Sequence, residues 1–335
     1  MQTHSAAWSP TRPAQSVNMP TRFSDPLVVI LGPTATGKSH LAMQLATKFN
    51  GQIISADSRQ VYSSMDIGTA KPSHADQQAI PHHVINVVEP DASFGLQMFK
   101  SLAIEAYRNV TNDHKLPFLV GGTGQYVWAV LEGWQVPDVP PNEAFRRHLE
   151  ALAAESGVDA VFELLVSVDN EASDKVDPRN LRRIIRAIEV ARHGKRNPGP
   201  RTIDPGFDNL IIGLKMDRQR LYKRIDDRVD EMMASGWLDE VRSLLARGYD
   251  SCLASMTSVG YRELSSHIRG DISLDEAVTK TKFRTHRYAR QQHAWFRADD
   301  PRILWIDAGE EMDSAATILQ EWLDISDRQG DNPGR

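Results

Sequence analysis

The stretch Leu27-Val28-Val29-Ile30-Leu31-Gly32-Pro33-Thr34-Ala35-Thr36-Gly37-Lys38-Ser39 joins an apolar segment to a glycine-rich turn. Its apolar part predicts a central parallel strand that is covered on both faces. The part from Gly32 to Ser39 fits G-x-x-x-x-G-K-[ST], in which backbone N–H groups surround an anion, the lysine reaches a phosphate and the hydroxyl binds Mg²⁺. Residues 40–49 predict a helix whose N-terminal end faces that anion. The stretch therefore predicts a P-loop fold, but it does not identify the phosphorylated compound.

Composition and charge place few limits on function. The chain has 335 residues, of which 41% are hydrophobic and 25% charged, and its net charge is −5. No apolar run approaches the roughly 20 residues that a membrane helix needs. Cys252 is the only cysteine, which excludes an internal disulfide and a cysteine-clustered zinc site. We expect a cytoplasmic protein that does not bind membranes and begins with a disordered tail, residues 1–25, without a signal peptide.

Two further predicted strands end in polar residues. Residues 52–56 form a short apolar segment followed by Asp57, and residues 116–120 form another followed by Gly121-Gly122-Thr123. Ligands bind beyond the carboxyl ends of strands in open parallel sheets, so Asp57 and Thr123 should emerge beside the phosphate loop. There, Asp57 can accept a proton or hold Mg²⁺ through water, although an aspartate that caps the next turn is the alternative. Many P-loop NTPases end such a strand in an aspartate that binds Mg²⁺, and this chain has glycines there.

The remaining pattern predicts an α/β fold with a helical insertion. Further strands are expected at residues 84–88, at 210–214 and, at the sheet edge, at 302–307. Helices are expected at residues 94–112 and at 220–246, the latter with a break at 235–236, and a last helix should end at residue 323. Proline-rich and glycine-rich stretches at 135–142 and 194–206 enclose a segment that is helical throughout. We therefore expect a P-loop core with a parallel sheet flanked by helices (26–137 and 207–324), a helical insertion domain (138–206) and a frayed tail (325–335).

Basic residues gather in two places. The insertion carries Arg179, Arg182, Arg183 and Arg186 at helical spacing, with Glu189 as the only nearby counter-charge in that helix. A solvated face and a phosphate-binding face explain this cluster about equally well. The second cluster interleaves cations with aromatic residues, which is typical of single-stranded RNA binding, although an aromatic core face with a basic outer face is the alternative. Its members are Lys280, Lys282, Phe283, Arg284, Arg287, Tyr288, Arg290, Trp295, Phe296 and Arg297.

Several of these segments, taken in order, resemble the bacterial tRNA dimethylallyltransferases. The motifs are the loop Gly32–Ser39, Asp57-Ser58-Arg59-Gln60-Val61-Tyr62, Met65-Asp66-Ile67-Gly68-Thr69-Ala70-Lys71-Pro72, Pro81-His82-His83, Gly121-Gly122-Thr123-Gly124, Arg186-Ala187-Ile188-Glu189, Gly260-Tyr261-Arg262-Glu263 and Tyr288 to Phe296. The family's usual Thr-Arg-Gln-Tyr-Ala-Lys-Arg-Gln appears here as Thr285-His286-Arg287-Tyr288-Ala289-Arg290-Gln291-Gln292, and Ala294 replaces a threonine.

This resemblance implies transfer of a dimethylallyl group from dimethylallyl diphosphate to N6 of adenosine 37, beside the anticodon of tRNAs that read codons beginning with U. The phosphate loop would hold the diphosphate and Asp57 would be the general base. Thr123 and Arg262 would hold the diphosphate, Lys38, Arg262 and Mg²⁺ would stabilise the leaving group, and Ser39 would help to bind the metal. The insertion would grip the anticodon stem-loop. The implied tRNA-binding residues are Asp57, Ser58, Arg59, Gln60, Thr123, Arg146, Arg179, Arg182, Arg183, Arg186, Thr285, His286, Arg287 and Arg290.

Two other classes of function compete with this interpretation. An ATP-binding P-loop kinase that phosphorylates a small hydroxyl compound would use Asp57 as its base, but it leaves both basic clusters unexplained. A nucleotide-dependent RNA-binding switch would give Asp57 and Thr123 no role. Nothing in the chain requires more than one copy, so we expect a monomer.

Overall fold

The computed structural model describes residues 26–137, 139, 141–194, 201–202, 205–309 and 311–330. Its main sheet has six strands in the order β3-β2-β4-β1-β7-β8, and every pairing is parallel. The strand β1 (Pro26–Leu31) lies inside the sheet between β4 (Leu116–Gly121) and β7 (Asp208–Lys215). This confirms the central position that its apolar sequence predicts, because both faces of β1 are buried.

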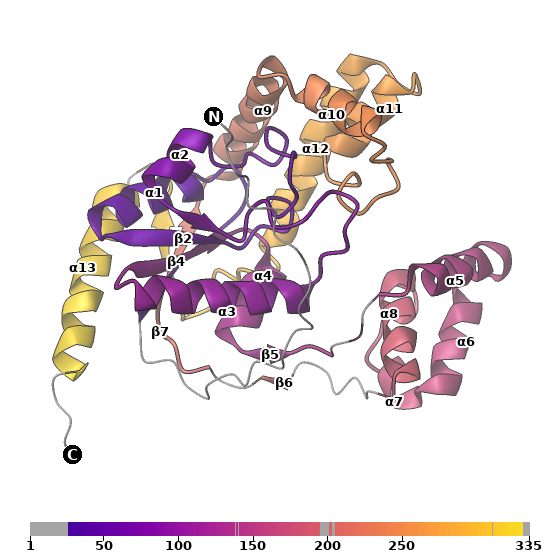
Figure 1. The fold of residues 1–335 in the computed structure, drawn as a ribbon, viewed down its shortest axis with the longest axis horizontal. Coiled ribbons are helices and arrows are strands. Elements are labelled where there is room, and N and C mark those ends of the chain that lie inside the picture. Colours follow the sequence, from indigo (N-terminus) through magenta and orange to yellow (C-terminus); the bar gives the residue numbers. More distant parts are fainter. Residues whose placement is uncertain are drawn as a thin grey trace, which may run out of the picture.

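The other strands are β2 (Gly51–Ser55), β3 (His82–His83) and β8 (Ile303–Asp307), and β8 is an edge strand as expected. One face of the sheet packs on α1 (Lys38–Lys48) and α13 (Glu311–Gly330), and the other packs on α3 (Leu96–Asn112) and α4 (Gly124–Leu131) (Figure 1). Because successive side chains of β1 point to opposite faces, Val28 and Ile30 join one core cluster while Leu27, Val29 and Leu31 join the other.

Four helices form a second layer beside the carboxyl edge of the sheet (Figure 1). They are α9 (Arg218–Ala234), α10 (Trp237–Ala246), α11 (Tyr261–Ile268) and α12 (Leu274–Gln292), and the short α2 (His74–Ala79) precedes β3. The predicted break between α9 and α10 is confirmed, since Gly236 has a φ of 96°. The helix α12 packs on both α9 and α11.

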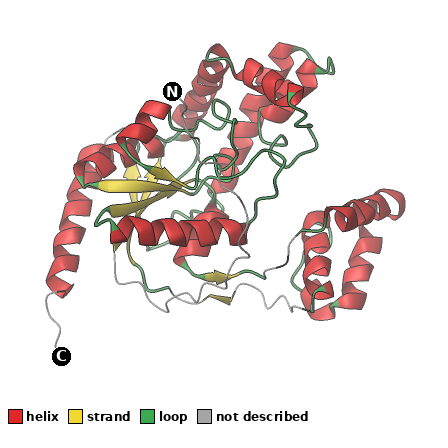
Figure 2. Ribbon diagram, in the orientation of Figure 1, coloured by secondary structure: helices red, strands yellow, loops and turns green. Residues whose placement is uncertain are grey.

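The inserted segment folds into a lobe that Figures 1 and 2 show set apart from the core. It contains α5 (Glu143–Ser156), α6 (Val158–Val168), α7 (Asn170–Ser173) and α8 (Leu181–Arg192), which bury an apolar cluster of their own. The chain enters and leaves the lobe through β5 (Trp134–Gln135) and β6 (Arg201–Thr202), which pair antiparallel. Sequence reasoning treated both stretches as hinges and missed this pairing.

The strand predicted at residues 84–88 is wrong. Val84 and Asn86 have φ angles of 62° and 52°, which a strand does not contain, and the strand instead consists of the two preceding histidines. The segment turns because the N–H groups of Asn86 and Val87 donate to the carbonyls of Gln60 and Val61.

The chain ends differ from the prediction where they are described. The last helix, expected to end at Leu323, continues to Gly330. The expected N-terminal tail, residues 331–335 and most of the second hinge lie outside the described residues. Among the described helices, none combines the length and the apolar character that a membrane crossing requires.

Candidate active site

The phosphate loop has the shape that its motif predicts. Gly32 has a φ of 141°, and a Cβ there would lie 2.5 Å from the carbonyl oxygen of Leu214, so this position excludes any side chain. The buried hydroxyl of Thr36 donates to the carbonyl of Pro33 at 2.9 Å. The Lys38 ammonium donates to the same carbonyl at 2.7 Å, and it therefore lies across the loop.

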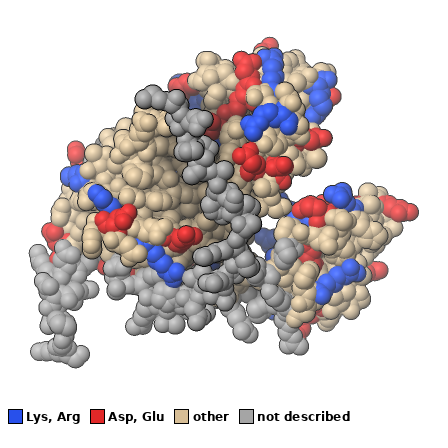
Figure 3. Space-filling model, viewed as in Figure 1, with Lys and Arg blue, Asp and Glu red and all other residues tan. Residues whose placement is uncertain are grey.

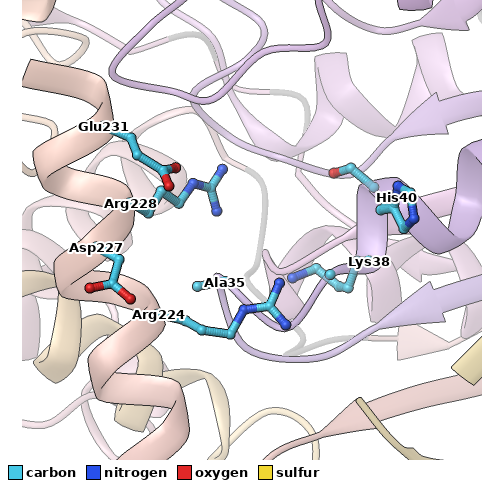
Figure 4. A pocket seen from close by; sticks show the side chains of 9 residues that line it. Ala35, Lys38, His40, Arg224, Asp227, Arg228 and Glu231 are labelled. Carbon is cyan, nitrogen blue, oxygen red and sulfur yellow. The ribbon is translucent and has the colours of Figure 1, made fainter. Parts of the chain in front are cut away.

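The loop faces a cavity of about 390 Å³ whose opposite wall is α9. Gly37, Lys38 and Ser39 line one side, and Arg224, Asp227, Arg228 and Glu231 line the other. Figure 4 shows Arg224 and Arg228 extending from α9 toward the loop that carries Lys38. Three cations thus surround a small space at a helix N-terminus, which is an arrangement that binds phosphate.

Sequence reasoning missed both arginines of α9. The pattern of residues 220–246 predicts only a helix with a break, but Arg224 and Arg228 face the cavity. Arg228 is partly buried, and its pKa is lowered by desolvation and by Arg224 while Asp57 opposes the shift. The two residues lie one helical turn apart and so share a face of α9, but this spacing does not show which element that face meets.

The pKa of Lys38 is lowered to about 7, mainly by desolvation and also by the charge of Arg228, while Asp57 acts in the opposite direction. The carboxylate of Asp57 therefore lies close enough to act on two of the three cations, Lys38 and Arg228. An anion bound in the cavity would favour the charged form of Lys38, because opposite charges stabilise each other.

Asp57 and Thr123 meet at the carboxyl edge of the sheet, as predicted. Asp57 Oδ1 accepts the N–H groups of Arg59 at 2.8 Å and Gln60 at 3.3 Å, which fixes the carboxylate in a tight turn. The N–H of Ser58 donates to Thr123 Oγ1 at 3.1 Å. The hydroxyl of Tyr288 is hydrogen-bonded to Thr123, and desolvation followed by the charge of Asp57 raises the pKa of Tyr288 to about 12. One end of α12 therefore reaches the same edge.

The side chains of Arg59 and Gln60 are bonded within the protein. Arg59 Nη1 donates to the carbonyl of Ala254 at 2.8 Å. Gln60 accepts from the hydroxyl of Ser55 at 2.9 Å and donates to the carbonyls of Thr69 and Ala70. Both residues therefore brace the loops around Asp57, and their contacts with RNA stay a prediction.

Arg262 does not line the described cavity beside the phosphate loop. It is exposed in the first turn of α11, where its neighbour Tyr261 donates to Glu240 at 2.6 Å. Glu240 also accepts the N–H groups of Asp66 at 2.8 Å and Ile67 at 2.7 Å. Glu240 thereby joins the two motifs around residues 66–72 and 260–263. The predicted diphosphate contact of Arg262 stays a prediction.

In the lobe, Arg146 and Arg186 converge on Glu189, whose side chain is 1% exposed. Arg146 donates to Glu189 at 2.8 Å and 3.0 Å, and the N–H of Asn142 donates at 3.0 Å. Arg186 also donates to the carbonyl of Val139 at 2.8 Å. This ionic network fixes the entry to the lobe, so both arginines have a structural role whether or not they also contact RNA.

We expect Glu189→Gln to destabilise the lobe by about 1–3 kcal/mol, because the two arginines would lose their charged partner in a partly buried position. Urea denaturation followed by circular dichroism would measure the change. Glu143→Gln is the matched control, since Glu143 is an exposed partner of Arg146 at 3.4 Å. Its effect should stay below about 0.5 kcal/mol, and equal effects of the two substitutions would contradict the structural role of Glu189.

Arg179, Arg182 and Arg183 are exposed at the start of α8, and Arg179 pairs with Asp177. Burial raises the pKa of Tyr62, while the positive charges of Arg59 and then Arg182 oppose that shift. Arg182 therefore lies within electrostatic range of Tyr62, in the loop that follows β2.

The predicted residues of α12 differ in their surroundings. Thr285 donates to the carbonyl of Thr281 at 2.8 Å, His286 Nε2 lies 2.9 Å from Asp226 Oδ1, and Arg290 donates to Tyr222 at 2.7 Å. Arg287 is exposed and has no ion-pair partner within the described residues. On the face shown in Figure 3, basic and acidic side chains alternate, so a uniformly basic surface is absent from its described part.

The model of a protein family described as IPP transferase matches residues 60–299. The model of a second family, described as isopentenyl transferase, matches residues 26–85. A tRNA dimethylallyltransferase of Roseiflexus sp. (strain RS-1) is 48% identical over 303 residues, which cover 89% of this chain and 99% of that relative. The tRNA dimethylallyltransferase of Dehalococcoides mccartyi is 45% identical over 302 residues, which cover 88% of this chain and 91% of that relative.

Two solved structures have a similar fold. The full-length tRNA isopentenylpyrophosphate transferase of Bacillus halodurans is 35% identical, with a TM-score of 0.68 over 92% of this chain and 99% of that chain. A eukaryotic dimethylallyltransferase, described as captured acting on tRNA, is 27% identical, with a TM-score of 0.74 over 90% of this chain and 79% of its own.

Proposed function

The chain belongs to the tRNA dimethylallyltransferase family, and from this membership we propose how its residues divide the work of prenyl transfer. The activity is dimethylallylation of adenosine 37 in tRNA. We assign the diphosphate of dimethylallyl diphosphate to the cavity between the phosphate loop and α9. This assignment rests on one observation, which is that three cations surround a cavity beside Asp57: Lys38, Arg224 and Arg228.

The adenine N6 is a weak nucleophile because its lone pair is delocalised into the ring. As N6 attacks the first carbon of the prenyl group, the bond from that carbon to the diphosphate oxygen breaks and its electron pair leaves with the diphosphate. Asp57 accepts the proton that N6 loses. Lys38 and the two arginines stabilise the charge that grows on the leaving group. Thr123, which is bonded to Ser58 and Tyr288, keeps the turn around Asp57 in place.

The residues at the cavity also fit Mg²⁺. Ser39 contributes a hydroxyl, and Asp227 and Glu231 contribute carboxylates on the facing wall, which are the oxygen ligands that this ion prefers. The described residues contain no cluster of three or more acidic, histidine or cysteine ligands, so diphosphate oxygens and water would complete the shell. The ion would neutralise charge on the diphosphate as it leaves.

The lobe grips the anticodon stem-loop, and α12 contacts the RNA from the other side of the site. The adenine leaves the stack of the anticodon loop, at a cost of a few kcal/mol, to bring N6 to Asp57. The expected substrates are tRNAs that read codons beginning with U. The enzyme acts in the cytoplasm, and a single chain carries every residue of the proposed site.

The test offers the protein Mg²⁺, unmodified tRNA and one of two labelled donors, dimethylallyl diphosphate or ATP labelled at its γ-phosphate. We expect label to enter tRNA only from dimethylallyl diphosphate. Label that entered tRNA only from ATP would support a kinase. If no label entered from either donor, the protein would be a binding protein for RNA that transfers no group. Both of these results would overturn the proposal.

We expect Arg182→Ala combined with Arg183→Ala to weaken tRNA binding several-fold and to reduce the slope of log Kd against log salt by about 1–2, since each lost phosphate contact removes counterion release. Filter binding at several salt concentrations would measure both values. Lys48→Ala with Lys115→Ala is the control, because these residues lie at the opposite edge of the sheet, where α1 ends and β4 begins. An unchanged slope in the arginine variant would identify α8 as a merely solvated face.

A further inference from the structure

Gln292 is a buried polar residue at the end of α12, and its side chain joins two catalytic loops. The residue is 3% exposed. Its Oε1 accepts the N–H of Thr34, in the phosphate loop, at 2.8 Å. Its Nε2 donates to the carbonyl of Gly122, at the carboxyl end of β4, at 2.8 Å. One amide therefore satisfies a backbone donor on one loop and a backbone acceptor on the other.

This pair of partners fixes the orientation of the amide. A backbone N–H can only donate and a carbonyl can only accept, so a reversed amide would lose both hydrogen bonds. The fit is also steric, since a Cβ at Gly122 would lie 2.2 Å from Gln292 Nε2. The absence of a side chain at Gly122 thus leaves the space that the amide occupies.

The same face of α12 makes a second contact with this edge. Tyr288 lies one helical turn before Gln292, and its hydroxyl is hydrogen-bonded to Thr123. The exposed Arg287 and Arg290 belong to the same stretch of helix. The helix α12 is consequently the element that touches the phosphate loop and the turn beside Asp57 at once.

We propose that Gln292 is a positioning residue for prenyl transfer, which holds the phosphate loop at a fixed distance and orientation from the turn at Gly122 and Thr123. The bound diphosphate and the base Asp57 thereby keep the separation that an in-line attack needs. Gln292 itself touches neither substrate. This role rests on the proposed function, because it presumes that the loop binds the diphosphate.

The first test compares Gln292→Met, which retains the length of the side chain without its hydrogen bonds, with Gln291→Met, the same change at the exposed neighbour. Calorimetry would measure the Kd of inorganic pyrophosphate with Mg²⁺, and single-turnover assays would measure the transfer rate. We expect Gln292→Met to raise this Kd and to lower the rate by about tenfold each, as the loss of two hydrogen bonds implies. The tRNA affinity of Gln292→Met should stay near that of the native protein, and its melting temperature should fall by no more than about 10 °C. Gln291→Met should match the native protein in every measurement.

The second test uses Gln292→Glu. An ionised carboxylate would face the carbonyl of Gly122 without a proton to donate, whereas a protonated one could donate to Gly122 and still accept from Thr34. The deficit in pyrophosphate affinity, relative to the native protein at each pH, should therefore shrink as the pH falls. A residue that served only to fill space would give a deficit that does not depend on pH.

The outcomes separate this role from the function on which it rests. Native protein that binds no pyrophosphate and transfers no prenyl group would overturn the proposed function and the positioning role together. If the native protein binds pyrophosphate and transfers the prenyl group, and Gln292→Met has the same Kd and the same rate, the positioning role alone is overturned. A lower melting temperature with unchanged Kd and rate would likewise show that Gln292 only stabilises the fold.

Discussion

Asp57→Asn is expected to lower the single-turnover rate of prenyl transfer by about 10²–10⁴-fold, because the amide cannot accept the proton that N6 loses. The side chain keeps an oxygen for the N–H groups of Arg59 and Gln60, which Asp57 now accepts at 2.8 Å and 3.3 Å. The turn should therefore retain its shape, and tRNA affinity should change by no more than a few-fold. Rapid-quench assays with saturating enzyme would measure the chemical step, and filter binding would measure the affinity.

Asp91→Asn provides the matched control for this substitution, since Asp91 is exposed and outside the described cavity. It should leave the transfer rate and the affinity unchanged. If Asp57→Asn transferred the prenyl group as fast as the native protein, Asp57 would not be the base. If it lost tRNA affinity in proportion to rate, its main role would be in binding.

Arg228→Met is expected to lower kcat/KM for dimethylallyl diphosphate by about 10²–10³-fold, the usual effect of removing one preorganised donor to a developing anion. Arg228 projects from α9 into the cavity opposite Lys38 (Figure 4). Desolvation lowers the pKa of this arginine and the charge of Asp57 opposes the shift, so the guanidinium lies close to the proposed base. Steady-state kinetics would give kcat/KM, and calorimetry would give the affinity for pyrophosphate.

Arg220→Met is the control, because Arg220 is exposed on the same helix and does not line the cavity. Arg228→Lys should recover only part of the loss, since a lysine keeps the charge but not the planar fork that holds two phosphate oxygens. Full activity of Arg228→Met would move the leaving-group site away from α9 and back toward Arg262.

The sequence predicts the strand, turn and helix of the phosphate loop well because the determinants of these elements are local. The strand, the turn and the helix that form the loop are contiguous, and the parallel arrangement brings Asp57 and Thr123 to the same edge. The arginines of α9 could not be found in this way, because helical periodicity does not reveal which core element a charged face will meet. Gln292 is similar, since its two partners lie far away in the sequence.

Several residues that were predicted from motifs to bind RNA make hydrogen bonds or ion pairs within the protein. Arg146 and Arg186 are paired with Glu189, and Gln60 is bonded to the loop at residues 69–70. These contacts depend on tertiary packing, which a motif does not specify. The strand predicted at residues 84–88 failed for a related reason, since its backbone bonds go to the loop after Asp57 instead of to a sheet neighbour.

The most direct test of the central assignment uses dimethylallyl diphosphate that is labelled in both the prenyl group and the phosphorus atoms. In a single turnover with tRNA, the prenyl label should appear on the adenosine beside the anticodon, as located by nuclease digestion and mass spectrometry. An equal amount of phosphorus label should appear as free pyrophosphate, with the same time course. Phosphorus label in the RNA, or release of pyrophosphate without a prenylated adenosine, would contradict the account.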